Sequence, residues 1–207
     1  QIFFSEKFLV KLDQIDYRKL QDVMDLEDKT SFVDNFVQLI NQGFKAIITE
    51  RIANIWKSIS VGGMKALKLI ERNKQKGFLL GSEAEFMTKS KSFKTSAKPQ
   101  NVDFAMKSLK DCGFTGNTFL ELQEFFRNHP LYEFCMPEDV YYLRIAYADQ
   151  PKGQWVRLMM DTIADTDGFP RVFRLGHNGN GLWVDSNWYY PTNLVNSDSL
   201  WVVRLRK

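Results

Sequence analysis

Few side chains in this sequence have the type and the spacing that catalysis requires. The chain contains two histidines, His129 and His177, and two cysteines, Cys112 and Cys135. His129 precedes a proline at a predicted helix end, where an imidazole can hydrogen-bond to the last carbonyl groups. Two cysteines are too few for a disulfide framework or for a four-ligand zinc site. From the sequence we therefore assign no catalytic residue, no metal ligand and no cofactor.

Three aspartates, Asp161, Asp165 and Asp167, come closest to a cation-binding motif, because hard cations bind clustered carboxylates. They lack the later glutamate of an EF-hand, and Asp and Gly are also common hairpin residues. The glycine-rich run 176–181 around His177 precedes no predicted helix and lacks the Lys-Ser/Thr of a P-loop. No Gly-x-Ser-x-Gly motif is present for a serine nucleophile. A hydrolase-type enzyme, which would need a closed pocket around His177 or these aspartates, is therefore the second alternative for the function.

Aromatic and asparagine side chains are concentrated between residues 176 and 196. Trp and Tyr supply a large contact area at a low cost in side-chain entropy, and Asn supplies adaptable hydrogen bonds, as recognition surfaces require. Trp155, Trp183 and Trp201 fall in predicted strands, where they would form the core of a sheet. The remaining candidate binding residues are Trp188, Tyr189, Tyr190, His177, Asn180 and Asn187. We expect a non-catalytic protein that recognises a macromolecule, namely another protein or a second copy of itself, through this surface.

Basic residues are concentrated in the middle of the chain. Residues 45–98 carry 12 basic and 4 acidic side chains, whereas the segments before and after carry an excess of acidic ones. Such a cluster can bind phosphate groups or an acidic protein surface, although lysine-rich helix faces are also common where they are simply solvated. The lysines that would form it are Lys89, Lys91, Lys94 and Lys98. Nucleic-acid binding through this segment is the first alternative, although the sequence has no RNA-binding signature.

The first half of the sequence predicts helices. Apolar residues recur at helical spacing near the N-terminus and again, over residues 32–59, as a wide stripe that must pack against neighbouring helices or a partner. Gly62 and Gly63 end this pattern. A short basic helix is predicted from residue 64, and Gly77 is placed to end it.

In the second half the hydrophobic period changes. A helix is predicted over residues 102–110, and Thr118 and Glu121 form a capping box that begins another, which ends near His129. After Pro137 the apolar residues alternate with a period of two, as in strands. The predicted strands span residues 141–147, 154–163, 172–175, 182–185 and 200–205.

These patterns predict an α+β protein, in which an N-terminal helical region precedes a sheet of about five antiparallel strands or a small barrel. We expect a helical region over residues 1–98, which contains the basic segment 45–98, and a domain of helix and sheet over 99–207. With 44% hydrophobic and 26% charged residues, the composition is that of a globular protein. No apolar stretch is long enough to span a bilayer and no secretory signal is visible, so we expect a cytoplasmic protein that does not bind membranes.

The order of several short motifs resembles a family of uncharacterised bacterial proteins. The motifs are Asp149-Gln-Pro-Lys-Gly-Gln-Trp155, Asp165-Thr-Asp-Gly-Phe-Pro170, Gly181-Leu-Trp183 and Trp201-Val-Val-Arg-Leu-Arg-Lys207. The resemblance covers residues 112–207. This chain differs from the family's pattern at the strand entry after Cys135 and at Gln154, where the family has Glu. The resemblance implies an ordered domain, and it implies no activity.

Overall fold

The structure is a computed structural model of the 207-residue chain, and it describes residue 52 and residues 54–206. Contacts divide the chain into two units, Gln1–Ala53 and Asn54–Lys207. The N-terminal helices and most of the amphipathic stripe predicted over residues 32–59 lie outside the described residues. Among the described residues of that stripe, Ile52 is helical, whereas residues 57–59 belong to the strand β1 (Lys57–Val61).

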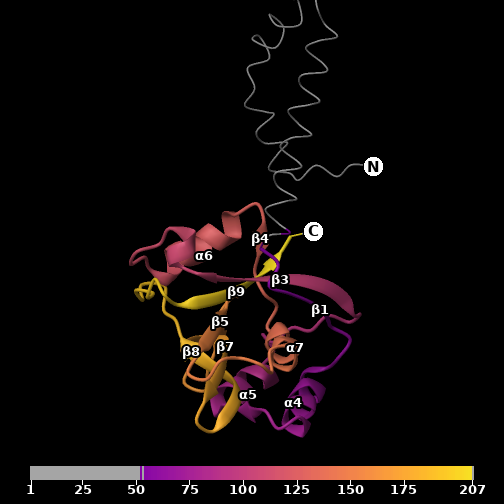
Figure 1. Cartoon of the computed structure of the whole chain (residues 1–207). Helices are drawn as coiled ribbons and strands as arrows, with labels where there is room; N and C mark the ends of the chain where they lie inside the picture. The colour runs from indigo at the N-terminus through magenta and orange to yellow at the C-terminus, as the bar shows by residue number, and fades with distance from the viewer. Residues whose placement is uncertain (1–51, 53, 207) are drawn as a thin grey trace, which may run out of the picture. The chain divides into compact units, whose positions relative to one another are not determined.

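Nine strands of the second unit form one mixed sheet (Figure 1). Seven of them follow the order β1, β3 (Gln100–Ser108), β9 (Leu200–Leu205), β5 (Trp155–Leu158), β7 (Pro170–Asn178), β8 (Gly181–Trp188) and β2 (Leu79–Leu80). The short strands β4 (Tyr132–Glu133) and β6 (Ile163–Ala164) pair with β9 and β7. The β5–β9 and β8–β2 pairs are parallel, and the other pairs are antiparallel. The α+β class is therefore confirmed, whereas the prediction of a five-stranded antiparallel sheet is corrected.

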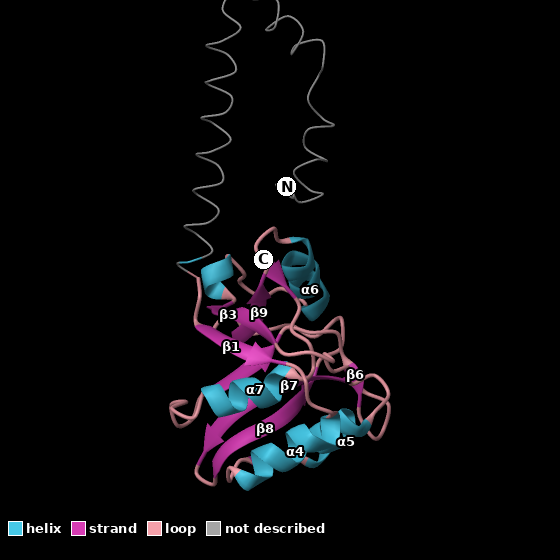
Figure 2. Cartoon of the chain, turned by 90° about the vertical axis from the view of Figure 1, so that its right-hand side faces the viewer, coloured by secondary structure: helices cyan, strands magenta, loops and turns pink. Residues whose placement is uncertain are grey.

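The described helices lie on both sides of this sheet. Three of them are on one side (Figure 2), namely α4 (Ala66–Gln75), α5 (Ser82–Lys89) and α7 (Asp139–Ala146). There α7 contacts β1, β7 and β8, and α5 contacts β8. Helix α6 (Phe119–Asn128) follows the 3-10 turn η1 (Lys110–Cys112) and packs on the other side, where Phe119 stacks on Trp201 of β9 with ring centroids 5.8 Å apart. We call the two sides the α7 side and the α6 side.

Local signals predicted several elements correctly. Helix α4 is followed by Gly77 at φ +79°, the left-handed conformation that glycine adopts most readily. The capping box at the start of α6 is present, since Thr118 N donates to Glu121 Oε2 at 2.7 Å and Glu121 N donates to Thr118 Oγ1 at 3.3 Å. The antiparallel β7–β8 pair and the last strand are also where they were predicted.

Two predicted elements have the wrong type. The strand expected over residues 141–147 is helix α7, whose residues Asp139–Arg144 are all buried. The helix expected over residues 102–110 is strand β3, which buries Phe104 on one side of the sheet and Ala105 on the other. Because residues 139–144 of α7 are all buried, this helix has no polar face and its sequence shows no helical period. In β3 only Val102, Phe104 and Ala105 are buried, and so short an apolar run is ambiguous between helix and strand.

The sheet joins residues from both sides of the domain boundary that we expected near residue 98. β1 pairs with β3 from Lys57↔Phe104 to Val61↔Gln100. Residues 54–206, on both sides of position 98, therefore belong to one compact unit.

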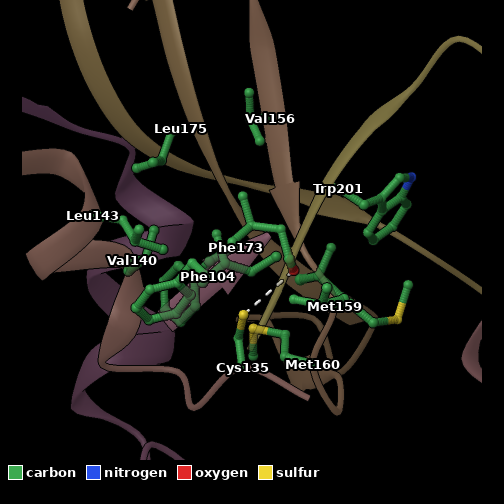
Figure 3. Packing of buried hydrophobic residues seen from close by; sticks show 14 of the residues in the cluster. Phe104, Cys135, Val140, Leu143, Val156, Met159, Met160, Phe173, Leu175 and Trp201 are labelled. Atoms are coloured by element: carbon green, nitrogen blue, oxygen red, sulfur yellow. Dashed lines mark hydrogen bonds between the residues drawn. The ribbon is translucent and has the colours of Figure 1, made fainter. Parts of the chain in front are cut away.

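Figure 3 shows the core between the sheet and α7, where Val140 and Leu143 lie near Phe104 and Phe173. One charged pair is buried beside it: Arg204 donates through Nε and Nη2 to the two carboxylate oxygens of Asp139, each at 2.7 Å. Burial raises the pKa of Asp139 to about 6, although the hydrogen bonds from Arg204 oppose this rise.

A second buried arginine explains the Asp149-Gln-Pro motif. Arg144 of α7 donates to Gln150 Oε1 at 2.6 Å, to the carbonyl oxygen of Tyr147 and to that of Gly176 at 3.3 Å. Gln150 in turn donates to the carbonyl oxygens of Gln154 and Leu175, at 3.0 and 3.2 Å. The glutamine of the motif thus ties the turn that precedes β5 to both α7 and β7.

Candidate functional site

An exposed group of aromatic rings lies where β7 begins and β8 ends. The side chains of Phe169, Trp188 and Tyr190 are 45%, 55% and 39% exposed. The rings of Phe169 and Tyr190 form an edge-to-face pair with centroids 6.1 Å apart. We call these three residues the aromatic surface.

The turn that precedes β7 is organised by Asp165. Its carboxylate accepts hydrogen bonds from the backbone N–H groups of Asp167 and Phe169, from Arg171 Nε at 2.6 Å and from Trp188 Nε1 at 3.2 Å. Burial alone would raise the pKa of Asp165, but these hydrogen bonds outweigh it and lower the pKa to about 2. Asp165 therefore holds the turn and fixes the indole of Trp188. These contacts give Asp165 a structural role in the motif Asp165-Thr-Asp-Gly-Phe-Pro170 that requires no bound cation.

Arg171 holds the indole of Trp188 from one face. Its guanidinium carbon lies 4.6 Å from the centroid of the Trp188 ring, and Nη1 donates to Ser186 Oγ at 3.3 Å. Two neighbours thus fix a side chain that is more than half exposed. Binding of a partner to this ring would therefore cost little side-chain entropy of Trp188.

Tyr189 and Asn187 are not part of the aromatic surface. Tyr189 is buried, and its ring centroid lies 4.9 Å from that of Phe119 and 5.1 Å from that of Trp201. Because side chains alternate along a strand, Asn187 is on the opposite side of the sheet from Trp188. The expectation that Tyr189 would offer a contact surface is corrected, since its ring belongs to the core.

His177 and Asn180 lie at the other end of the β7–β8 hairpin. His177 Nδ1 is 2.6 Å from the carbonyl oxygen of Gln150, and the backbone N–H of Asn180 donates to Asn178 Oδ1 at 2.9 Å. β8 has eight residues. At about 3.3 Å per residue this hairpin end is roughly 23 Å from Trp188, so the predicted binding residues do not form one site.

The lysines of the basic segment follow one another from α5 to the start of β3. Lys89 forms an ion pair with Glu85 at 2.9 Å, and Glu85 also binds Lys74 at 2.7 Å. Lys94 donates to the carbonyl oxygen of Lys91, and both of these side chains and that of Lys98 are exposed. Nucleic-acid binding by this group stays a prediction.

One cleft of about 390 Å³ lies beside the connection between β4 and α7. Its lining residues are Ser92, Lys94, Phe134, Cys135, Met136, Pro137, Asp161, Thr162 and Ile163. Burial raises the pKa of the Cys135 thiol, which donates to the carbonyl oxygen of Val202 at 3.3 Å, so this thiol is not an activated nucleophile. Asp161 forms an exposed ion pair with Arg127 at 2.8 Å. Within residues 54–206, no three His, Cys, Asp or Glu side chains gather as a metal site requires.

Sequence reasoning missed Phe169 and Arg171, although a signal for both was present. The hairpin turn Gly179-Asn180 has two residues, and a two-residue turn fixes the register of the strands on either side. That register places Arg171 opposite Trp188. Counting outward from the turn would therefore have located both residues.

Comparison of this chain with protein-family models, with curated proteins and with solved structures finds no match. The resemblance of residues 112–207 to a bacterial family stays a prediction. In the part of the chain that the structure describes, no helix is both long enough and apolar enough to cross a bilayer.

Proposed function

We propose that this protein recognises a partner protein through the aromatic surface of Phe169, Trp188 and Tyr190. The observation that carries the proposal is the exposed indole of Trp188, which Asp165 and Arg171 hold in one orientation. Residues that dominate binding energy in protein interfaces are enriched in Trp, Tyr and Arg. A ring that is exposed and already fixed before binding has the properties of such an anchor.

The surroundings of the aromatic surface also support this proposal. The turn 165–168 is attached to α5, because Thr166 donates through N and Oγ1 to the carboxylate of Glu83. After Tyr190 the chain turns back, and Tyr190 N donates to Asn193 Oδ1 at 2.8 Å. The apolar rings therefore have polar groups around them, as in the centre and rim of a protein interface.

In-cell photocrosslinking tests this proposal. A benzoylphenylalanine at position 169 should form an adduct with a defined protein, because the ring of Phe169 would lie in the interface. The same photoreactive residue at Leu67, which is 64% exposed on α4, is the control for exposure. Adding Trp188→Ala should abolish the adduct at position 169 and should weaken binding of the purified partner by at least about tenfold.

Two outcomes would contradict the proposal. The first is that the photoreactive residue gives the same adducts at positions 169 and 67, and that Trp188→Ala does not change them. The second is an adduct that nuclease removes, because it would show that the surface binds nucleic acid. Concentration-dependent sedimentation of the purified chain then distinguishes a second copy of this protein from a different partner.

A further inference from the structure

A row of paired residues that includes three cationic side chains crosses the sheet on the α6 side. Phe173 faces α7, with its ring centroid 6.4 Å from that of Tyr141, so the next residue, Arg174, points to the α6 side. The strand register then places five paired residues in one row on that side. In order across the sheet they are Lys107, Trp201, Arg157, Arg174 and Asp185.

Arg157 has no polar partner among the described residues. Its Nε is buried without a hydrogen bond, and no described carboxylate forms an ion pair with it. The residue directly opposite on β7 is Arg174, which carries the same charge. Like charges at directly opposite positions destabilise a sheet, so this pairing calls for a counter-charge.

The nearest carboxylate of the row is already occupied. Asp185 Oδ2 accepts hydrogen bonds from Arg174 Nη2 at 2.6 Å and Nε at 3.0 Å. Arg174 also lies over the ring of Trp155, with its guanidinium carbon 4.0 Å from the ring centroid. These contacts fix the side chain of Arg174. Because the Asp185 carboxylate pairs with Arg174, it forms no ion pair with Arg157.

A second buried donor belongs to the residue that pairs with Arg157 on β9. Trp201 is fully buried, and its indole Nε1 has no hydrogen-bond partner. Its neighbour in the parallel β9–β5 register is Arg157. Buried N–H groups are almost always hydrogen-bonded in folded proteins, so two unpaired donors at paired positions indicate an acceptor that this part of the chain does not supply.

We infer that Arg157, together with Trp201 and Arg174, binds an oxyanion on the α6 side of the sheet. The ligand would carry a phosphate or a carboxylate group, since the planar guanidinium fork of arginine fits both. This site is separate from the aromatic surface, because Trp188 and Arg171 lie on the α7 side. A negative result for oxyanion binding therefore does not contradict partner binding at the aromatic surface, and the reverse also holds.

The inference can be tested by NMR titration of the purified protein. Inorganic phosphate and acetate are titrated separately at constant ionic strength, with chloride as the balancing anion. The indole N–H signal of Trp201 and the Nε–H signal of Arg157 should shift and saturate. Saturation with phosphate alone, with acetate alone or with both supports the inference and identifies the ligand chemistry.

Three variants connect the signal to the site. Arg157→Met should weaken binding at least about tenfold, a free-energy difference of about 1.4 kcal/mol. Arg157→Lys keeps the charge but loses the planar fork, and it should also bind more weakly. Arg127→Met removes one arginine whose side chain is 57% exposed, and it should leave the titration unchanged.

Other results would overturn the inference. Shifts that grow linearly without saturation, or that a separate chloride titration reproduces, would show nonspecific anion association and no defined oxyanion site. Unchanged signals throughout would show that water satisfies the two donors. Saturation that persists in Arg157→Met would place the anion elsewhere.

Discussion

The ring of Trp155 lies against the backbone of Gly176, its partner in the β5–β7 register, so closely that a Cβ at position 176 would overlap ring carbon Cζ3. With Arg174 over the same ring, the indole is fixed. Gly176→Ala should therefore lower the free energy of unfolding by about 1–3 kcal/mol, because overpacking forces the ring to move. Urea unfolding measures this difference. Gly179→Ala is the matched control, since no atom lies within 4 Å of a Cβ there, and an equal loss in both variants would contradict the explanation.

Asp165 makes stability depend on pH. Its pKa is lowered to about 2 in the folded protein, from an ordinary value of 3.8. A carboxylate with a lowered folded pKa contributes stability above its unfolded pKa, and this contribution is lost as the pH falls through the folded pKa. The difference in melting temperature between the wild type and Asp165→Asn should thus be largest above pH 4 and should shrink between pH 4 and pH 2. A difference in melting temperature that stays constant from pH 7 to pH 2 would contradict this assignment.

The buried pair of Asp139 and Arg204 depends on both partners. Arg204→Met should destabilise the fold by about 3–5 kcal/mol, because it leaves a buried carboxylate without its partner. The double variant Asp139→Leu, Arg204→Met should lose less free energy of unfolding than the summed losses of the single variants Asp139→Leu and Arg204→Met. Since the hydrogen bonds from Arg204 hold the pKa of Asp139 down, this pKa should rise further above 6 in Arg204→Met. Carbon NMR of the carboxyl group measures the rise, and an unchanged pKa would exclude this role for Arg204.

Arg157 should be a residue whose removal stabilises the protein. In buffer without phosphate or carboxylate, Arg157→Met should raise the free energy of unfolding by about 1 kcal/mol, because it removes a buried unpaired donor and a like-charge pair. Chemical denaturation in a chloride buffer measures this. Arg174→Met, which instead leaves Asp185 without its ion-pair partner, should not stabilise the protein. Destabilisation by Arg157→Met would show that packing of the aliphatic part of the arginine side chain stabilises the fold by more than its unpaired charge destabilises it.

Much of the local structure could be predicted from the sequence because short-range interactions determine it. Thr118 and Glu121 are three residues apart, and the capping box needs nothing beyond them. Gly77 ends α4 through its own backbone conformation. By contrast, the sequence predicts the wrong type for α7 and β3. Residues 139–144 of α7 are all buried, so its sequence has no polar face. In β3, Val102 and Phe104 alternate with Asn101 and Asp103, but such a short run does not decide between helix and strand without its sheet neighbours.

The same division applies to the candidate sites. The sequence alone located an aromatic segment at 188–190 and the turn residue Asp165. Only the tertiary structure decided which rings are exposed: Tyr189 turns into the core beside Trp201, while Trp188 and Tyr190 remain outside. It also placed Arg157 between Trp201 and Arg174, since pairing of strands distant in the chain decides which residues are neighbours across a sheet. Side-chain types and local turns follow from near neighbours along the chain, whereas burial and cross-strand partners depend on how distant segments pack.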